Sequence, residues 1–146
     1  GGRVLVVGDA DLSFGRSLSR QGPAELTLTT YESHDELLRL YDTFQPNLQS
    51  VAGLPHVRVM HGVDALDLPR SLGGEESFTD VVFMFPHVVG RANIARNREL
   101  VRGYLRSCRQ LLPPSGRAYI ALEPPQSGHF SPSPREWRQS WKLSEA

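Results

Sequence analysis

The sequence predicts an α/β domain with a doubly wound, mostly parallel sheet. Short apolar runs alternate with amphipathic segments along the chain, and the runs end in glycine, acidic or polar residues. The clearest run, Val4-Leu5-Val6-Val7, leads straight into Gly8, which is typical of a strand that enters a tight turn before a helix. Strands joined by helices pair in parallel through right-handed crossovers. Such sheets bind ligands at the carboxyl ends of their strands.

Each expected strand is a run of apolar or β-branched residues bounded by turn residues. The five strands are expected at residues 3–7, 25–31, 57–60, 78–85 and 117–122. Helices are expected at residues 13–20, from 33 up to Pro46, at 47–52, over 93–112 and, beyond a Pro/Ser/Gly-rich loop, at 135–141. Ser13 or Asp11 could cap the first helix, and Ser33 with Glu36 has the spacing of a capping box. Residues 69–77 form a polar, glycine-containing segment.

The long helix over residues 93–112 is expected to bury one face against the sheet. Its apolar stripe follows a helical period: Val101, Tyr104, Leu105, Cys108, Leu111 and Leu112. Cys108 is the only cysteine of the chain, so a disulfide framework and a Cys-rich zinc site are excluded. This cysteine content suits a reducing, intracellular compartment, either the cytoplasm or the nucleus. No apolar stretch is long enough to cross a bilayer.

The chain is expected to be one domain of 146 residues with no net charge, since 16 Lys and Arg balance 16 Asp and Glu. Its arginines are unevenly distributed, and six gather in one stretch: Arg91, Arg96, Arg98, Arg102, Arg106 and Arg109. A basic rim beside a pocket could hold the phosphates of an RNA without reading its sequence. The alternative is a solvated charged helix face.

The turn after the first strand is the first candidate for cofactor binding. It resembles a degenerate glycine-rich turn, and its candidate residues are Gly8, Asp9, Ala10, Ser13 and Phe14. Small side chains let the backbone approach a ligand. The acidic side chains would repel a pyrophosphate but suit the positive amino group and sulfonium of S-adenosylmethionine. An ordinary tight turn between strand and helix is the alternative.

Acidic residues also follow the second and third strands. Glu32 could accept hydrogen bonds from both ribose hydroxyls of a cofactor, or it could simply lie in the field of the next helix N-terminus. Asp64 could accept from an adenine amino group, with Ala65 leaving the slot open, or it could cap a short helix. Acids at both places fit an adenosine-type cofactor, and with the acidic turn they favour S-adenosylmethionine over NAD.

The fourth strand ends in an unusual group of residues, Phe85, Pro86 and His87. Phe85 could stack on a flat base, and Pro86 would stiffen the turn and aim a carbonyl at the reacting atom. His87 could assist the removal of a proton from a substrate nitrogen. In the alternative interpretation the phenylalanines belong to the core and His87 is a loop histidine.

Four segments together resemble a known family. They are G-D-A-D-L-S-F at 8–14, G-V-D-A at 62–65, F-M-F-P-H-V-V-G at 83–90 and N-R-E-L at 97–100. In this order and spacing they are similar to the Rossmann-like domain of the large-subunit ribosomal RNA uridine-N3 methyltransferases. The sequence R-E-W…S-W near residues 135–141 resembles a branch in which this domain is fused to a ferredoxin-fold anticodon-binding domain.

The resemblance implies a class I methyltransferase sheet with S-adenosylmethionine as the methyl donor and a structured RNA, rRNA or tRNA, as the acceptor. The Gly8 turn would then bind the donor, Glu32 its ribose and Asp64 its adenine, while residues 85–87 would face the base. It also implies that the last strands of the sheet lie beyond this chain. A ferredoxin-fold anticodon-binding domain is a further expected partner in the parent chain.

The sequence departs from the family pattern G-E-G-N-F-S-F at Asp9, Ala10, Asp11 and Leu12, and Met84 stands where a polar residue is common. Three hypotheses therefore stay open. The chain is an active RNA methyltransferase, a degenerate methyltransferase fold that serves as an RNA- or protein-binding module, or an NAD-dependent oxidoreductase. The acidic turn disfavours the third.

Overall fold

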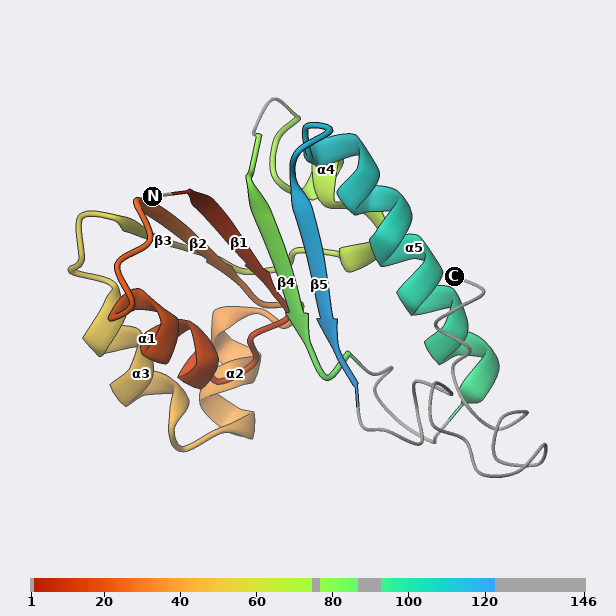
Figure 1. Ribbon diagram of the computed structural model, residues 1–146. Helices are drawn as coiled ribbons and strands as arrows, with labels where there is room; N and C mark the ends of the chain where they lie inside the picture. The colour runs from red at the N-terminus through yellow and green to blue at the C-terminus, as the bar shows by residue number, and fades with distance from the viewer. Residues whose placement is uncertain (1, 75–76, 87–92, 123–146) are drawn as a thin grey trace.

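The computed structural model describes residues 2–74, 77–86 and 93–122, which form a single five-stranded sheet. All strand pairs are parallel, and the strands lie in the order β3-β2-β1-β4-β5 (Figure 1). The strands are β1 (Arg3–Val7), β2 (Glu25–Thr29), β3 (Val57–Met60), β4 (Asp80–Met84) and β5 (Arg117–Ala121). The predicted doubly wound α/β fold is therefore confirmed.

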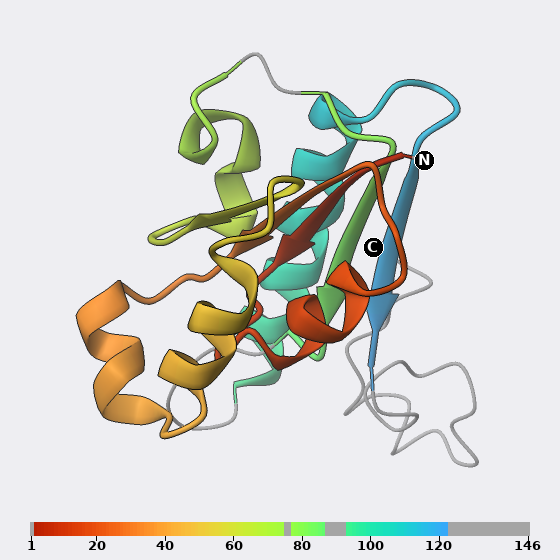
Figure 2. The same ribbon diagram turned by 90° about the vertical axis from the view of Figure 1, so that its left-hand side faces the viewer.

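Helices cover both faces of the sheet, as Figures 1 and 2 show. One face carries α1 (Ser13–Ser19), α2 (His34–Leu40) and α3 (Phe44–Val51). The other carries the 3₁₀ turn η1 (Ala65–Asp67), α4 (Leu68–Ser71) and α5 (Ile94–Leu111). Two apolar clusters fill the two interfaces, one between the sheet and α1–α3 and the other between the sheet and α4–α5.

Helix α5 buries most of the stripe that the sequence predicts, while Leu105 and Leu112 are half-buried. Tyr104 and Cys108 are buried, the Tyr104 ring meets Phe83 edge to face with centroids 5.1 Å apart, and the Tyr104 hydroxyl lies 2.8 Å from the carbonyl oxygen of Tyr119. Burial raises the pKa of the Cys108 thiol to about 11, so the thiol stays protonated at neutral pH. The predicted burial of Cys108 on the apolar stripe is therefore confirmed.

The structure corrects the expected helices around Pro46. The helix that begins after Ser33 already ends at Leu40, and a separate helix, α3, begins at Phe44. Pro46 therefore lies in the first turn of α3, where its missing N–H leaves no intrahelical bond unmade. The expected polar segment over 69–77 also begins inside a short helix, α4. The helix expected at 135–141 lies outside the described residues.

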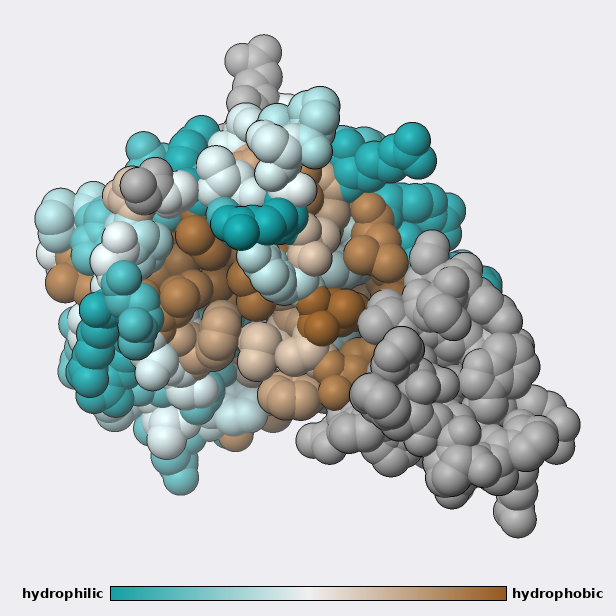
Figure 3. Space-filling model, viewed as in Figure 1, coloured by the Kyte–Doolittle hydropathy of each residue, from teal (hydrophilic) through white to brown (hydrophobic). Residues whose placement is uncertain are grey.

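Beyond α1, the sheet face that carries this helix is not covered by any described helix over β4 and β5 (Figure 1). Apolar side chains gather there in Figure 3. Val82 and Met84 are half-buried, and Tyr119 keeps 44% of its surface exposed. None of the helices in the described part of the chain combines the length and apolar character that crossing a bilayer requires.

Candidate functional site

The strand order places a natural binding crevice at the carboxyl ends of β1 and β4. The chain proceeds from β1 to β2 and β3 on one side, whereas β4 and β5 lie on the other side of β1. The loops after β1 and β4 therefore diverge to opposite faces, and a crevice opens between them. The candidate residues after β1, β2, β3 and β4 all follow strands that end at this one edge of the sheet (Figure 1).

Gly8 is required by the geometry of the first turn. Its φ angle is +66°, and a Cβ built on it would lie 2.8 Å from Cε2 of Phe83 on β4. A side chain at this position would meet both a disfavoured backbone conformation and a packed ring. Gly8 is therefore needed for the packing of β1 against β4. The approach of the backbone to a ligand at this turn, which the sequence suggested, stays a prediction.

The Asp9 carboxylate holds the N-terminus of α1. Its Oδ2 atom accepts a hydrogen bond from the backbone N–H of Gly15 at 2.6 Å, and its own backbone N–H donates to the carbonyl oxygen of Thr29 at 2.9 Å. Burial raises the pKa of Asp9 to about 6 even though the bonds from Gly15 and Phe14 oppose this shift. The carboxylate that the sequence suggested as a cofactor ligand therefore accepts a hydrogen bond that stabilises the turn.

The neighbouring Asp11 is also engaged by the protein. Its Oδ1 accepts from the backbone N–H of Ser13 at 3.0 Å and its Oδ2 from the Thr43 hydroxyl at 2.7 Å. Burial would raise the pKa of Asp11, but the bonds from Ser13 and Thr43 outweigh it and lower the pKa below its ordinary value. Asp11 therefore satisfies the N–H of the first residue of α1, as one of the two sequence alternatives proposed, although it stands one residue before the N-cap position. It also ties this turn to α3 through Thr43.

The alternative prediction, that Ser13 caps α1, is wrong. Ser13 is the first helical residue, and the N-cap is Leu12, which makes no capping hydrogen bond through its side chain. Leu12 is fully buried and adopts a left-handed conformation with φ of 63°. Side chains rarely adopt this conformation because Cβ crowds the following carbonyl. Apolar burial of the leucine offsets that cost. No sequence pattern predicts a left-handed leucine at this position.

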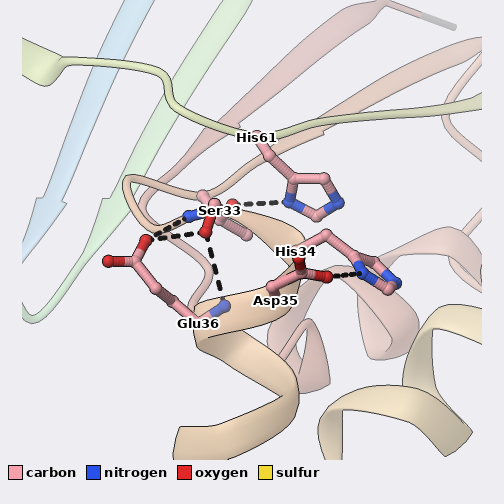
Figure 4. Close-up of polar contacts among 6 residues, drawn as sticks. Ser33, His34, Asp35, Glu36 and His61 are labelled. Atoms are coloured by element: carbon pink, nitrogen blue, oxygen red, sulfur yellow. Dashed lines mark hydrogen bonds and ion pairs between the residues drawn. The ribbon is translucent and has the colours of Figure 1, made fainter.

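Glu32 lies at the end of β2, directly before the capping box of α2. The box forms as predicted, since the Glu36 carboxylate accepts from the Ser33 backbone N–H at 2.8 Å and the Ser33 hydroxyl accepts from the Glu36 backbone N–H at 3.3 Å (Figure 4). Glu32 is half-buried, and within residues 2–74, 77–86 and 93–122 no group bonds to its carboxylate. Glu32 is the one candidate acid at this edge whose carboxylate makes no hydrogen bond to another described residue.

Asp64 follows β3 and caps η1. Its Oδ1 accepts from the backbone N–H of Leu66 at 2.9 Å, and its backbone N–H donates to the Ser71 hydroxyl at 3.2 Å. The capping alternative for Asp64 is therefore confirmed. The second carboxylate oxygen has no such bond within the described ranges. Ala65, expected to leave room for an adenine, is buried.

Sequence reasoning missed a ring cluster beside these acids. His61, at the end of β3, lies edge-on to His34 with centroids 5.8 Å apart and to Phe44 with centroids 5.9 Å apart. Burial, together with the nearby His34, lowers the pKa of His61, which favours the neutral ring. A histidine at the start of a helix and another after a strand give no periodic signal in the sequence, so only the tertiary structure shows that they meet.

Phe85 is the most conspicuous residue at the end of β4. Its φ angle is +49°, its ring keeps 51% of its surface exposed, and its backbone N–H donates to the carbonyl oxygen of Ala121 on β5 at 2.9 Å. Pro86 is buried and Met84 half-buried. The core alternative therefore fails for Phe85 but holds for Phe83, which is buried. His87 lies outside the described residues.

The arginine stripe runs along α5 and away from the crevice. Helix α5 begins on the side toward which the strand arrows point (Figure 1). Arg96 lies in the first turn at this end and is exposed, Arg98 is half-buried, and Arg102 is exposed further along. Arg109 lies about 20 Å from Arg96 along the axis, at 1.5 Å per residue. Only the start of the stripe is near the crevice, and Arg91 lies outside the described residues.

A family model covers nearly the whole chain. The model described as rRNA (uridine-N3-)-methyltransferase BTM5-like matches residues 5–146. Two curated relatives are also similar. Ferredoxin-fold anticodon-binding domain-containing protein 1 of Homo sapiens is 33% identical over 145 residues, 97% of this chain and 23% of that protein. Its homolog in Mus musculus is 31% identical over 144 residues, with the same coverage. The chain thus spans about a quarter of the length of these relatives.

Solved structures support the fold. The crystal structure of TrmN from Thermus thermophilus superimposes with a TM-score of 0.61 at 22% identity, over 85% of this chain and 37% of that one. The glycopeptide N-methyltransferase MtfA, complexed with S-adenosylmethionine, gives a TM-score of 0.60 at 18% identity, over 91% of this chain and 52% of that one. The five-stranded order found here therefore matches that of class I methyltransferases.

Proposed function

Because the chain belongs to the family described as rRNA (uridine-N3-)-methyltransferase BTM5-like, we propose that its crevice binds S-adenosylmethionine and methylates a base nitrogen of a structured RNA. The acceptor is an rRNA or a tRNA, and the uridine N3 atom is the target by analogy with the family. Such an acceptor would place the activity in the cytoplasm or the nucleus.

The donor site is built by the loops after β1, β2 and β3. The Gly8 turn lets the backbone approach the donor, with Ala10, Ser13 and Phe14 around it. Glu32 is the proposed ribose ligand, because its half-buried carboxylate is not engaged by the described residues. Asp64, with its second carboxylate oxygen, and Ala65 line the adenine side. Asp9 acts in this site by fixing the turn through Gly15.

The observation that carries the proposal is the conformation of Phe85. An aromatic residue with φ of +49° and a half-exposed ring is held at the carboxyl end of β4. A left-handed phenylalanine costs about 1–2 kcal/mol, and exposing its ring forgoes apolar burial. Strain of this kind gathers at ligand sites, where the surrounding structure fixes it. We propose that the ring stacks on the acceptor base, as aromatic side chains do with unstacked bases.

The transfer step needs alignment more than acid–base chemistry. When bound, S-adenosylmethionine would supply a methyl group on a positively charged sulfur. The acceptor nitrogen would gain an N–CH₃ bond as the S–CH₃ bond broke, which would leave the sulfur neutral. Phe85 and the Pro86 carbonyl would orient the base for in-line attack. His87 is the proposed acceptor of the proton that leaves the nitrogen.

The arginines near the start of α5 are the proposed RNA contacts. Arg96 and Arg102 are exposed, and Arg91 and Arg98 complete the proposed set. They would hold phosphates and position the acceptor without selecting a sequence. The human and mouse relatives are named for a ferredoxin-fold anticodon-binding domain, and we propose that such a domain is a partner in the parent chain.

Calorimetric titration with S-adenosylmethionine and S-adenosylhomocysteine tests the donor site, with Asp64→Ala as the weakened variant. Binding that the variant reduces supports the proposal. Transfer of a labelled methyl group to purified rRNA or tRNA then identifies the acceptor. No binding of either ligand to the folded, full-length protein would refute the methyltransferase proposal.

A second function follows from Met84, which places a side chain without a hydrogen-bonding group next to Phe85. A site that lacks this polar contact could bind the donor and an RNA without turnover. Donor binding with no methyl transfer to any RNA would identify the domain as a degenerate, RNA- or protein-binding module. A preference for NAD over S-adenosylmethionine would favour the oxidoreductase instead.

A further inference from the structure

The ends of β2 and β3 are joined by a chain of hydrogen bonds that ends at Glu32. The Thr30 hydroxyl donates to the backbone carbonyl oxygen of Glu32 at 2.8 Å, and the same oxygen atom of Thr30 lies 2.7 Å from Nδ1 of His61. The dashed line from His61 in Figure 4 marks the second contact. Thr30 is fully buried, so these partners have replaced water around its hydroxyl.

The direction of these bonds follows from the number of hydrogens available. A threonine hydroxyl carries one hydrogen, and a carbonyl oxygen can only accept. Because the Thr30 hydrogen goes to Glu32, the contact with His61 requires the hydrogen to be on Nδ1 of the imidazole. The chain therefore runs from His61 through Thr30 to Glu32, with each group donating to the next.

The ring of His61 is fixed from two further elements. It packs against His34 at the start of α2 and Phe44 at the start of α3, with interplanar angles of 68° and 69°. The backbone ties the same two loops together, since Val63 N–H donates to the Thr30 carbonyl at 2.9 Å. The His61 donor thus has little freedom to leave Thr30.

We propose that Thr30 and His61 are positioning residues for the cofactor ribose, because their hydrogen-bond chain fixes the backbone from which the Glu32 carboxylate extends. This inference rests on the proposed function, in which Glu32 binds the ribose hydroxyls. A carboxylate that must meet two hydroxyls at once depends on its backbone position, and loss of one hydrogen bond in that support weakens the contact.

Substitutions can remove the chain while keeping the shape of the site. Thr30→Val removes the hydroxyl at nearly constant volume, and Thr30→Ser retains it. His61→Asn places an amide N–H near the position of Nδ1, whereas His61→Leu removes the donor. Thr29→Val is the matched control, because the Thr29 hydroxyl is equally buried and donates to the Val6 carbonyl at 2.8 Å instead of to the Glu32 loop.

The readout is the Kd of S-adenosylhomocysteine by calorimetry, with thermal unfolding and binding stoichiometry measured for each full-length variant. We expect Thr30→Val and His61→Leu to weaken binding about tenfold. We expect Thr30→Ser, His61→Asn and Thr29→Val to stay within about threefold of the unsubstituted protein, because each keeps the chain.

A double substitution separates positioning from general damage. If Thr30 acts through Glu32, Thr30→Val should change the affinity less than about twofold in a Glu32→Gln background, because coupled residues are non-additive. An equal loss in both backgrounds, or no loss from Thr30→Val in the original background, would overturn the inference. Failure of the unsubstituted protein to bind S-adenosylhomocysteine would instead refute the proposed function, and the inference with it.

Discussion

The carboxylate of Asp9 and the backbone N–H of Gly15 are joined by a hydrogen bond of 2.6 Å inside the protein. This bond links the end of β1 to the first turn of α1 and leaves the acid buried. A Cβ on Gly15 would lie 2.6 Å from the same carboxylate oxygen and 2.3 Å from Leu28. The turn that begins at Gly8 therefore depends on an acid and a glycine six residues apart.

Protonation of Asp9 should make the stability of the domain depend on pH. The pKa of Asp9 rises from an ordinary 3.8 to about 6 on folding because of burial. Between these values the folded state binds more protons than the unfolded state, so the free energy of unfolding falls as the pH rises through this window. The stability lost across the whole window amounts to about 3 kcal/mol, and the loss is nearly complete at pH 7.

Asp9→Asn tests this expectation, since an amide oxygen can still accept from Gly15 but does not titrate. The free energy of unfolding, measured by denaturant titration from pH 4 to 7, should fall for the original protein relative to the variant. The difference between the two proteins should change by about 2 kcal/mol across that range. Parallel pH profiles would contradict the assignment.

Gly8→Ala should destabilise the domain by about 2–4 kcal/mol, through its positive φ and the contact with Phe83 together. Gly62→Ala has a φ of +71° in open space and should cost about 1–2 kcal/mol. Gly53→Ala, which has open space and no positive φ, should stay within about 0.5 kcal/mol. Unfolding free energies that do not follow this order would refute the role of Phe83.

Substitutions of Phe85 should separate strain from function. Phe85→Gly should be more stable than Phe85→Ala by about 1 kcal/mol, because glycine adopts the left-handed conformation without strain. Both variants should lose about tenfold or more in kcat/KM for methyl transfer, since base stacking is worth about 1–3 kcal/mol. Phe85→Tyr should retain activity. Full activity in Phe85→Ala would exclude a stacking role.

Arginines at the two ends of α5 should differ in their effect on RNA binding. Arg96→Gln should weaken RNA binding and reduce the slope of log K against log salt by about 1 for a single lost phosphate contact. Arg109→Gln removes the same charge from the far end of the same helix and serves as the control. Equal effects of the two substitutions would indicate general attraction and not a local RNA contact.

The sequence by itself determined the elements and the edge of the sheet where the candidate residues lie. The sequence predicted β1 and β3 with their observed bounds, β1 from a consecutive apolar run and β3 from a short, mostly apolar run between turn residues. The spacing of Ser33 and Glu36 predicted a capping box, and the period of α5 predicted burial of Cys108. These features depend on neighbours within a few positions, which a linear sequence displays.

Only the tertiary structure decided which of the candidate acids form hydrogen bonds within the fold. Asp9, Asp11 and Asp64 each accept a backbone N–H near a helix start, whereas the Glu32 carboxylate bonds to no other described group. A carboxylate suits a helix N-terminus and a ligand equally well, so the residue type alone cannot distinguish the two. The difference depends on where the helix begins relative to the strand.

The left-handed Leu12 and Phe85 and the chain from His61 to Glu32 likewise arise from packing between distant segments. Their partners lie on other strands or helices, as with Ala121 for Phe85 and Thr30 for His61. Local preferences oppose a positive φ at leucine or phenylalanine, and contacts across the sheet overcome them. The sequence therefore specifies the scaffold, and long-range packing determines how its crevice is shaped.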